Sequence, residues 1–206
     1  QNVQRIVIVD FGAQYTQLIA RRVREAKVFC EVVPCSISVE EIRAKVPVGI
    51  ILSGGPASVL DADAPHVDAS LYALGIPVLG ICYGAQLISW MAKGSVITAE
   101  TSEYGKIDMT VSKKASLLFE DVPAESVVWM SHTDRICDLP QGYEVTAFTA
   151  KCPVAAMENA EKKIYAIQAH PEVTHSRYGN QILRNFLYNV CRCQGQWQMD
   201  SFIEDT

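Results

Sequence analysis

The chain has 206 residues, 49% hydrophobic and 20% charged, which is ordinary for one globular α/β domain with a full core. Its net charge of −5 argues against a general nucleic-acid-binding surface, and no apolar run is long enough to span a bilayer. The seven cysteines are scattered, odd in number and without a CxxC pair, which indicates free thiols in a reducing compartment. We therefore expect a cytoplasmic protein without membrane or nucleic-acid partners.

The first half of the chain alternates apolar strands with helical patterns. An apolar run ending in an aspartate predicts the first buried strand, Arg5–Asp10, and helical spacing follows it. The same alternation predicts further strands at 28–33, 49–53 and 76–81. It predicts helices at 15–26, 65–74 and 84–91, and a capping box at 38–41 predicts the start of another short helix. This order is typical of a doubly wound parallel sheet that carries its function at the carboxyl ends of the strands.

The second half reads mainly as short strands. Partly alternating runs predict strands at 96–98, 106–111, 127–130, 143–148 and 154–157. We expect them to extend the sheet or to add an antiparallel layer. A buried strand at 164–169 follows, and apolar residues at 182–191 mark a last long helix. The sequence thus predicts one domain over residues 1–193 and a tail at 194–206.

The segment from Gly80 to Gly84 places a cysteine between a predicted strand and a predicted helix. Its pattern, Gly-x-Cys-x-Gly, is a nucleophile elbow with a thiol in place of a hydroxyl. Such a turn strains the backbone of Cys82, and the two glycines remove side chains that would collide. The helix N-terminus favours a thiolate. The pattern predicts a catalytic thiol, and a small buried residue at a tight turn is the alternative.

A catalytic thiol needs a base, and His170 is the best candidate among the four histidines. It follows a buried strand and has a carboxylate, Glu172, two positions on. Side chains two apart in an extended segment point the same way, so Glu172 could orient the imidazole while His170 takes the proton of Cys82. A surface His–Glu pair that caps the strand is the alternative.

Acyl transfer also needs donors for an oxyanion. The N–H of Tyr83, directly after the cysteine, is one candidate. The glycine-rich turn at 53–56 supplies a second, with Gly55 as the better donor, although an ordinary turn is the alternative. The turn lacks the Lys-Ser/Thr of a Walker loop and the Asp-Ser of ATP pyrophosphatases, so we reject nucleotide binding there.

Three separated motifs resemble a known family. Ser-Gly-Gly-Pro at 53–56, Gly-Ile-Cys-Tyr-Gly-x-Gln at 80–86 and Gln-x-His-Pro-Glu at 168–172 are together similar to class I, triad-type glutamine amidotransferases. Further segments at 10–15 and 129–132 resemble the N-terminal glutaminase domains of GMP synthases. The resemblance covers about residues 5–193. It implies a flavodoxin-like fold, with an open, mostly parallel sheet, flanking helices and an added antiparallel segment.

The resemblance also implies a reaction, the hydrolysis of glutamine to glutamate and ammonia through a γ-glutamyl thioester. Cys82 would be the nucleophile, His170 the base and then the acid, and Glu172 its orienting group. Gly55 and Tyr83 would form the oxyanion hole. The positions that match the substrate-binding residues of the family are Gln86, Ser131 and Asp134, and His132 is expected to be structural.

The family resemblance further implies a partner. The ammonia would serve an ATP pyrophosphatase domain, in cis or in trans, that converts XMP to GMP. ATP and magnesium are expected only there, because the Ser-Gly-Gly-x-Asp-Ser loop of that domain is absent here, and the 194–206 tail resembles the linker into it. No cofactor or metal is expected in this chain, since neither His170 with His175 nor Cys191 with Cys193 has the usual ligand spacing. The oligomeric state is not predicted.

Two positions depart from the family pattern. Ala169 stands where an aromatic residue usually precedes the histidine, and Ala85 stands where methionine is frequent. Slack behind the imidazole would lower the rate, and we expect Ala169→Phe to be tolerated. The alternatives to a GMP-synthase glutaminase are the same chemistry in another pathway, such as anthranilate or carbamoyl phosphate synthesis, a stand-alone γ-glutamyl hydrolase, or a catalytically silent glutamine-binding module.

Overall fold

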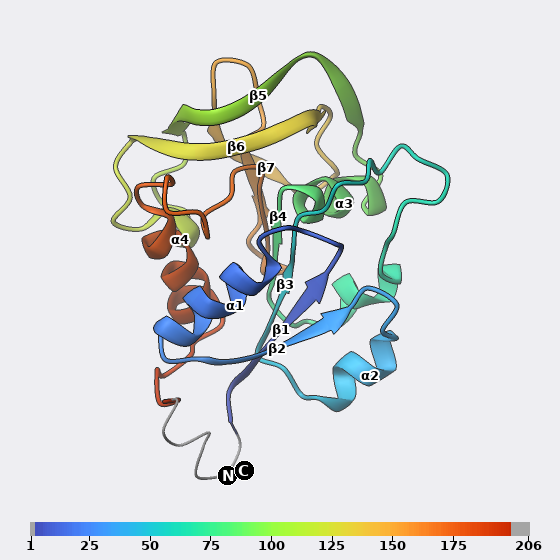
Figure 1. Cartoon of the computed structure of the whole chain (residues 1–206), viewed down its shortest axis with the longest axis vertical. Coiled ribbons are helices and arrows are strands. Elements are labelled where there is room, and N and C mark those ends of the chain that lie inside the picture. Colours follow the sequence, from blue (N-terminus) through green and yellow to red (C-terminus); the bar gives the residue numbers. More distant parts are fainter. Residues whose placement is uncertain (1–2, 199–206) are drawn as a thin grey trace.

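One sheet runs through residues 3–198, the part of the chain that the computed structural model describes, in the order β2-β1-β3-β4-β9-β8-β7-β5-β6 (Figure 1). The parallel strands are β1 (Arg5–Asp10), β2 (Phe29–Pro34), β3 (Gly49–Leu52), β4 (Val78–Ile81) and β9 (Ile164–Ile167). The antiparallel strands are β5 (Val96–Val111), β6 (Glu125–Ile136), β7 (Glu144–Phe148) and β8 (Ala156–Asn159). The predicted fold class is confirmed, and the antiparallel extension supplies as many strand pairings as the parallel part.

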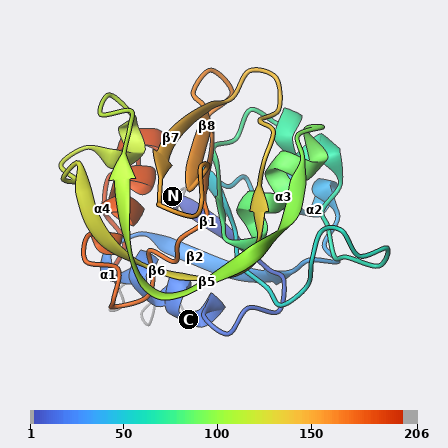
Figure 2. The same cartoon turned by 90° about the horizontal axis from the view of Figure 1, so that it is seen from above.

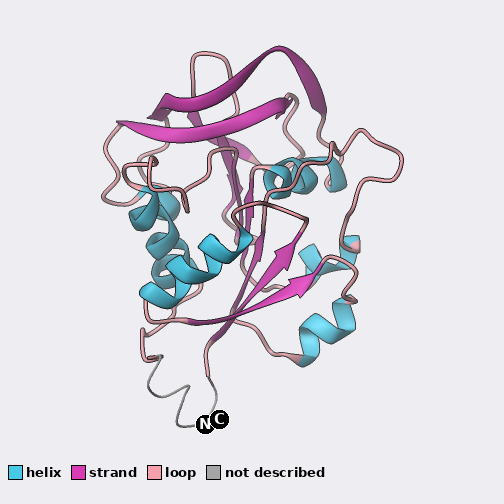
Figure 3. Cartoon of the chain, viewed as in Figure 1, coloured by secondary structure: helices cyan, strands magenta, loops and turns pink. Residues whose placement is uncertain are grey.

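Helices cover both faces of the parallel half (Figure 3). The helices are α1 (Thr16–Glu25), α2 (Val39–Ala44), α3 (Tyr83–Met91) and α4 (Gly179–Asn185), which continues into a π-helical turn, Phe186–Val190. Alternate residues of β1 face opposite sides, as a period of two requires. Ile6 and Ile8 pack in one core cluster with residues of α1 and α4, whereas Val7 and Val9 pack in the other with residues of α2 and α3.

Some predicted elements differ from the structure. The helix expected at 65–74 is only a 3₁₀ turn, Ala69–Ala73, because the Asp68 side chain accepts the Ser70 N–H and starts the turn late, and Gly75 follows with φ 78°. The strands expected at 96–98 and 106–111 are one strand, β5. It stays paired with β6 across a register shift between Thr98 and Glu103, so a bulge rather than a loop absorbs the irregular residues.

The β5–β6 ribbon curves over the carboxyl end of the parallel strands, as Figures 1 and 2 show. It brings the end of β6 above the junction between β4 and α3. Residues 194–198 pack back on the domain, where the Trp197 N–H donates to the Lys27 carbonyl at 3.1 Å. Residues 1–2 and 199–206, which include most of the predicted tail, lie outside the described part. No helix within the described part has the length and apolar character needed to cross a membrane.

Candidate active site

Cys82 lies at the turn between β4 and α3 with φ 54° and ψ −108°. A positive φ is strained for a residue with a side chain. A Cβ on Gly80 would come within 2.5 Å of the Gly84 carbonyl oxygen, and a Cβ on Gly84 would collide with the carbonyl oxygen of Leu52. Helix α3 therefore presses directly on β3 and β4, and the predicted elbow is present.

His170 and Glu172 reach this elbow from the neighbouring strand. Ile81 of β4 pairs with Ile167 of β9, so the segment after β9 emerges beside Cys82. The His170 Nδ1–H donates to Glu172 Oε2 at 2.8 Å, which leaves the other ring nitrogen for the hydrogen bond with Cys82. Both side chains are buried. The fold thus brings the histidine and the carboxylate predicted from the sequence together beside the thiol.

The groups around His170 raise the pKa of its imidazole. Burial alone would lower the pKa of the imidazole, but the hydrogen bonds and negative charges of Cys82 and Glu172 outweigh it and raise the pKa of His170 to about 10. The ring also meets Tyr15 edge-on, with the ring centroids 5.7 Å apart. At neutral pH the site thus favours a charged imidazolium next to the cysteine sulfur.

The turn after β3 closes the site. The Ser53 hydroxyl oxygen accepts the Phe11 N–H at 3.1 Å, and the Ser53 carbonyl accepts the Gly84 N–H at 3.1 Å. A Cβ on Gly54 would lie 3.2 Å from His170 Cε1, which shows how closely the turn approaches the imidazole. Gly55 is more strongly constrained, since a Cβ there would lie 2.5 Å from the Phe11 carbonyl oxygen. Gly55 is therefore required by the close approach of the Phe11 backbone.

A cavity of about 310 Å³ opens over Cys82. Its volume suits a small polar ligand. The walls include every residue predicted for the oxyanion hole and for substrate binding, namely Gly55, Tyr83, Gln86, Ser131 and Asp134. His170 and Glu172 are buried outside this wall. The cavity can therefore hold a small amide next to the sulfur of Cys82, and the charged imidazole of His170 forms a hydrogen bond with that sulfur.

Residues 7–190 match the family described as glutamine amidotransferase class-I. The chain belongs to this family. Among curated relatives, it is 55% identical to a glutamine-hydrolyzing GMP synthase of Acetivibrio thermocellus and 53% identical to one of Clostridium botulinum, each over 203 residues. These matches cover 98% of this chain but 40% of each relative. The chain therefore spans well under half the length of these relatives.

One solved structure agrees with the family assignment, and a second shows the same fold. A Thermoplasma acidophilum protein, provisionally described as one subunit of GMP synthase, superposes with a TM-score of 0.81 at 32% identity, and the match covers 100% of both chains. A glutamine amidotransferase of Thermotoga maritima gives a TM-score of 0.75 at 16% identity over 94% of this chain and 100% of the other, which shows the shared fold alone.

Sequence reasoning assigned no role to three polar residues near the amidotransferase cavity, Ser58, Thr98 and Gln168, although Gln168 is the first residue of the Gln-x-His-Pro-Glu motif. The Gln168 Nε2 lies 3.5 Å from Cys82 Sγ, and the Gln168 Oε1 accepts from Gln86 Nε2 at 3.1 Å. Asp134 accepts hydrogen bonds from the hydroxyl groups of Ser58 and, at 3.0 Å, Thr98. A signal existed for Gln168, because it lies two positions before His170 at the end of a strand. No local pattern indicates the two hydroxyl partners, which come from other segments.

His132 lines the cavity and belongs to a buried polar cluster behind it. Its Nδ1 lies 2.9 Å from the Asp134 carbonyl oxygen, and its Nε2 lies 2.7 Å from Glu103 Oε1. The structural role expected for His132 stays a prediction. Glu103, His132 and Cys152 bring potential ligand atoms within 4.8 Å of one another, the one such group among the described residues. These groups already have protein partners, because Glu103 accepts hydrogen bonds from His132 and, at 2.7 Å, from the Thr149 hydroxyl, and the Cys152 thiol donates to the Val154 carbonyl at 3.4 Å.

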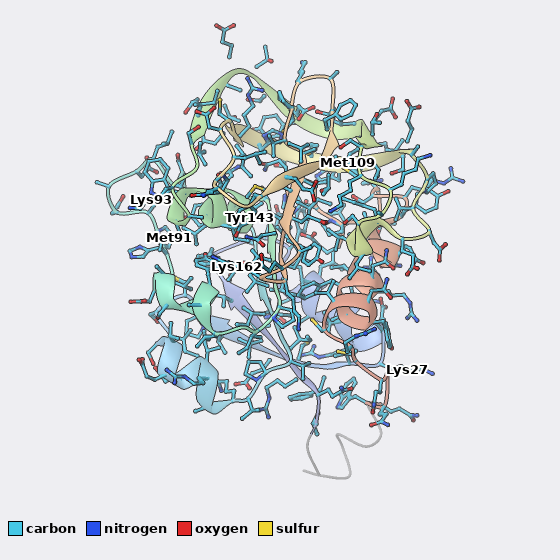
Figure 4. All side chains as sticks on the ribbon, turned by 180° about the vertical axis from the view of Figure 1, so that it is seen from behind. Lys27, Met91, Lys93, Met109, Tyr143 and Lys162 are labelled. Carbon is cyan, nitrogen blue, oxygen red and sulfur yellow. The ribbon has the colours of Figure 1, made fainter. Side chains whose placement is uncertain are left out.

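A larger cavity, of about 790 Å³, lies elsewhere on the amidotransferase domain. Its lining includes Met91, at the end of α3, together with Tyr143 and Lys162, and Figure 4 labels these three residues in the same region of the domain. Its described lining contains none of the predicted site residues. The smaller cavity is the better candidate site, because it alone of these two exposes the cysteine of the elbow.

Proposed function

We propose that this domain hydrolyses glutamine to glutamate and ammonia through a γ-glutamyl thioester on Cys82, and that the ammonia serves the conversion of XMP to GMP. One observation carries the proposal: a cavity of amino-acid size ends on an elbow cysteine that is paired with a buried His170–Glu172 couple. The similarity to glutamine-hydrolyzing GMP synthases supports the pathway.

The first step forms the thioester. The Cys82 sulfur attacks the side-chain carbonyl carbon of glutamine, and His170 holds the proton that the thiol has given up. The negative charge that develops on the carbonyl oxygen is stabilised by the N–H groups of Gly55 and Tyr83. Collapse of the tetrahedral intermediate breaks the C–N bond, and His170 gives its proton to the departing nitrogen, so ammonia leaves.

The second step frees the enzyme. His170, now neutral, takes a proton from a water molecule, and the oxygen of that water attacks the thioester carbon. The oxyanion forms in the same hole, the C–S bond breaks and glutamate leaves. Glu172 takes no part in these proton transfers: its carboxylate accepts the His170 Nδ1–H at 2.8 Å, which fixes the tautomer and stabilises the imidazolium.

The amino-acid end of glutamine would bind at the other end of the cavity. The Asp134 carboxylate, which Ser58 and Thr98 hold in place, suits the ammonium group. Ser131 and Gln86 border the same space and offer further polar groups to the substrate. The side chain of a glutamine bound in this way would be long enough to bring its amide to Cys82.

The use of the ammonia depends on a partner domain. This chain spans 40% of the length of the GMP synthases that it matches. We assign the ATP- and magnesium-dependent activation of XMP to a synthetase domain of the ATP pyrophosphatase type, joined in cis or bound in trans. This chain supplies the ammonia and binds neither ATP nor magnesium in this proposal.

The test is ammonia release from glutamine by the purified chain and by Cys82→Ala, each with and without a synthetase domain, XMP, ATP and magnesium. We expect release that requires Cys82 and that the synthetase mixture stimulates. Release that the mixture does not change, together with cleavage of substituted γ-glutamyl amides, would favour a stand-alone hydrolase. Glutamine binding without release under either condition would favour a silent binding module and refute the proposal.

A further inference from the structure

We infer that Gln168 is a catalytic residue that donates its side-chain N–H to the sulfur of Cys82, and that Gln86 is the positioning residue that fixes the orientation of this amide. The inference rests on the proposed role of Cys82 as the nucleophile. Both glutamines are buried. The Gln168 Nε2 lies 3.5 Å from Cys82 Sγ, within hydrogen-bond reach of a sulfur acceptor.

The orientation of the two amides follows from a backbone carbonyl. The Asp134 carbonyl oxygen can only accept, so the Gln86 atom 3.0 Å from it must be the nitrogen, Nε2. The same Nε2 lies 3.1 Å from the Gln168 amide and donates to it, so the Gln168 atom facing it must be the oxygen, Oε1. The nitrogen of Gln168 is therefore left facing Cys82. A flip of either amide would bring two like groups together.

The backbone around both glutamines is rigid. The Gln168 N–H donates to the Ala155 carbonyl at 2.7 Å, directly after β9, and Gln86 lies in the first half of α3, where its N–H donates to the Cys82 carbonyl at 3.1 Å. The amide of Gln168 is thus held by a strand end on one side and by a helix on the other. This preorganisation spares the site a reorganisation cost when charge develops on the sulfur.

The sulfur has partners suited to different protonation states. As a thiol, Cys82 can donate its S–H to the Ser131 carbonyl oxygen, 3.7 Å away. As a thiolate, it accepts from Gln168, and a hydrogen bond to an ionised acceptor is stronger than one to a neutral acceptor. Gln168 therefore stabilises the thiolate both before attack and again when the sulfur leaves the thioester. This contribution adds to that of His170 and comes from a neutral group.

The experiment measures the pH dependence of Cys82 alkylation by iodoacetamide, read by mass spectrometry of the peptide that contains Cys82. It compares the wild type, Gln168→Met, which keeps the length of the side chain but removes the donor, and Gln86→Met. Gln181→Met is the matched control, because Gln181 also donates to a side-chain amide, at 2.8 Å to Asn185, away from the site. The exposed Cys137 in each sample serves as an ordinary thiol for reference.

We expect the midpoint of Cys82 alkylation to rise by about one pH unit in Gln168→Met, by less in Gln86→Met, and not at all in Gln181→Met. The double variant should not exceed Gln168→Met, because Gln86 acts through Gln168. This inference alone would be overturned if the midpoint in Gln168→Met were unchanged while wild-type Cys82 is alkylated with a midpoint well below that of Cys137. Wild-type Cys82 that titrates like Cys137 would overturn the proposed function as well.

Discussion

The backbone N–H of His170 donates to the carbonyl oxygen of Trp129 at 2.9 Å, so the histidine segment is attached to the edge of strand β6. Ser176 completes the attachment. Its hydroxyl donates to the His170 carbonyl oxygen at 2.6 Å and accepts the Trp129 N–H at 2.9 Å. The imidazole is thus positioned by the same strand that carries Ser131 and Asp134 to the cavity, which links the position of the imidazole to that of the cavity wall.

Removal of the Ser176 hydroxyl should weaken this attachment. Ser176→Ala leaves the Trp129 N–H and one acceptor site of the His170 carbonyl without their partner, which we expect to lower the free energy of unfolding by about 1–3 kcal/mol and to reduce ammonia release. Urea denaturation and a glutaminase assay would measure the two effects. Ser176→Thr keeps the hydroxyl and should restore most of both. Equal behaviour of the two variants would contradict the bridging role.

The raised pKa of His170 predicts a pH-dependent stability. The imidazole has an unperturbed pKa of 6.5 and a folded value of about 10, so the stabilisation that its charge gives is fully present below pH 6.5 and is lost as the pH rises through about 10. In Glu172→Gln one of the groups that raises the pKa is gone, so the loss should be smaller and should occur at lower pH. Urea denaturation at several pH values between about 6 and 10.5 would measure how the free energy of unfolding depends on pH. Glu40→Gln, which changes an exposed carboxylate, is the control. The same pH dependence in Glu172→Gln and the wild type would rule the prediction out.

A methyl group at the elbow should displace the helix. Gly84→Ala places a Cβ against the Leu52 carbonyl, and we expect a loss of about 1–3 kcal/mol in unfolding free energy and a severe loss of Cys82 reactivity. The matched control is Gly75→Ala, because a Cβ there meets no heavy atom within 4 Å and only the backbone is strained, at φ 78°. Normal reactivity of Cys82 in Gly84→Ala would show that the close approach is not required.

The environment of Ala169 reverses the expectation drawn from the sequence. The residue is completely buried in a packed core cluster, so a phenyl ring must push its neighbours apart. We now expect Ala169→Phe to lower the unfolding free energy by about 1–3 kcal/mol instead of being tolerated. The same change at the exposed Ala115 should have little effect. Wild-type stability of Ala169→Phe in urea denaturation would restore the original expectation.

The sequence predicted features that local rules determine. Strand β1 has the predicted bounds because its apolar residues are buried on both faces, and the capping box of Ser38 and Glu41 forms as expected. Cys82, His170 and Glu172 could be grouped in advance, because residues after parallel strands share one edge of the sheet.

The remainder of the site depends on distant contacts. Asp134 is held by hydroxyl groups from the turn after β3 and from β5, and Glu103 reaches His132 only because β5 and β6 pair through a register shift. No spacing within the sequence encodes these pairings. The extended pairing of β5 likewise overrides the short local runs that indicated separate strands.

The neighbouring positions of β4 and β9 have a consequence for folding. Ile81 and Ile167 pair directly although they are far apart in the chain, and β9 is the last strand of the described part. Cys82 thus acquires its imidazole only when this late, long-range pairing has formed. If His170 activates Cys82 as proposed, a chain still emerging from the ribosome carries an unactivated thiol, and the cysteine gains its base only when the sheet is complete.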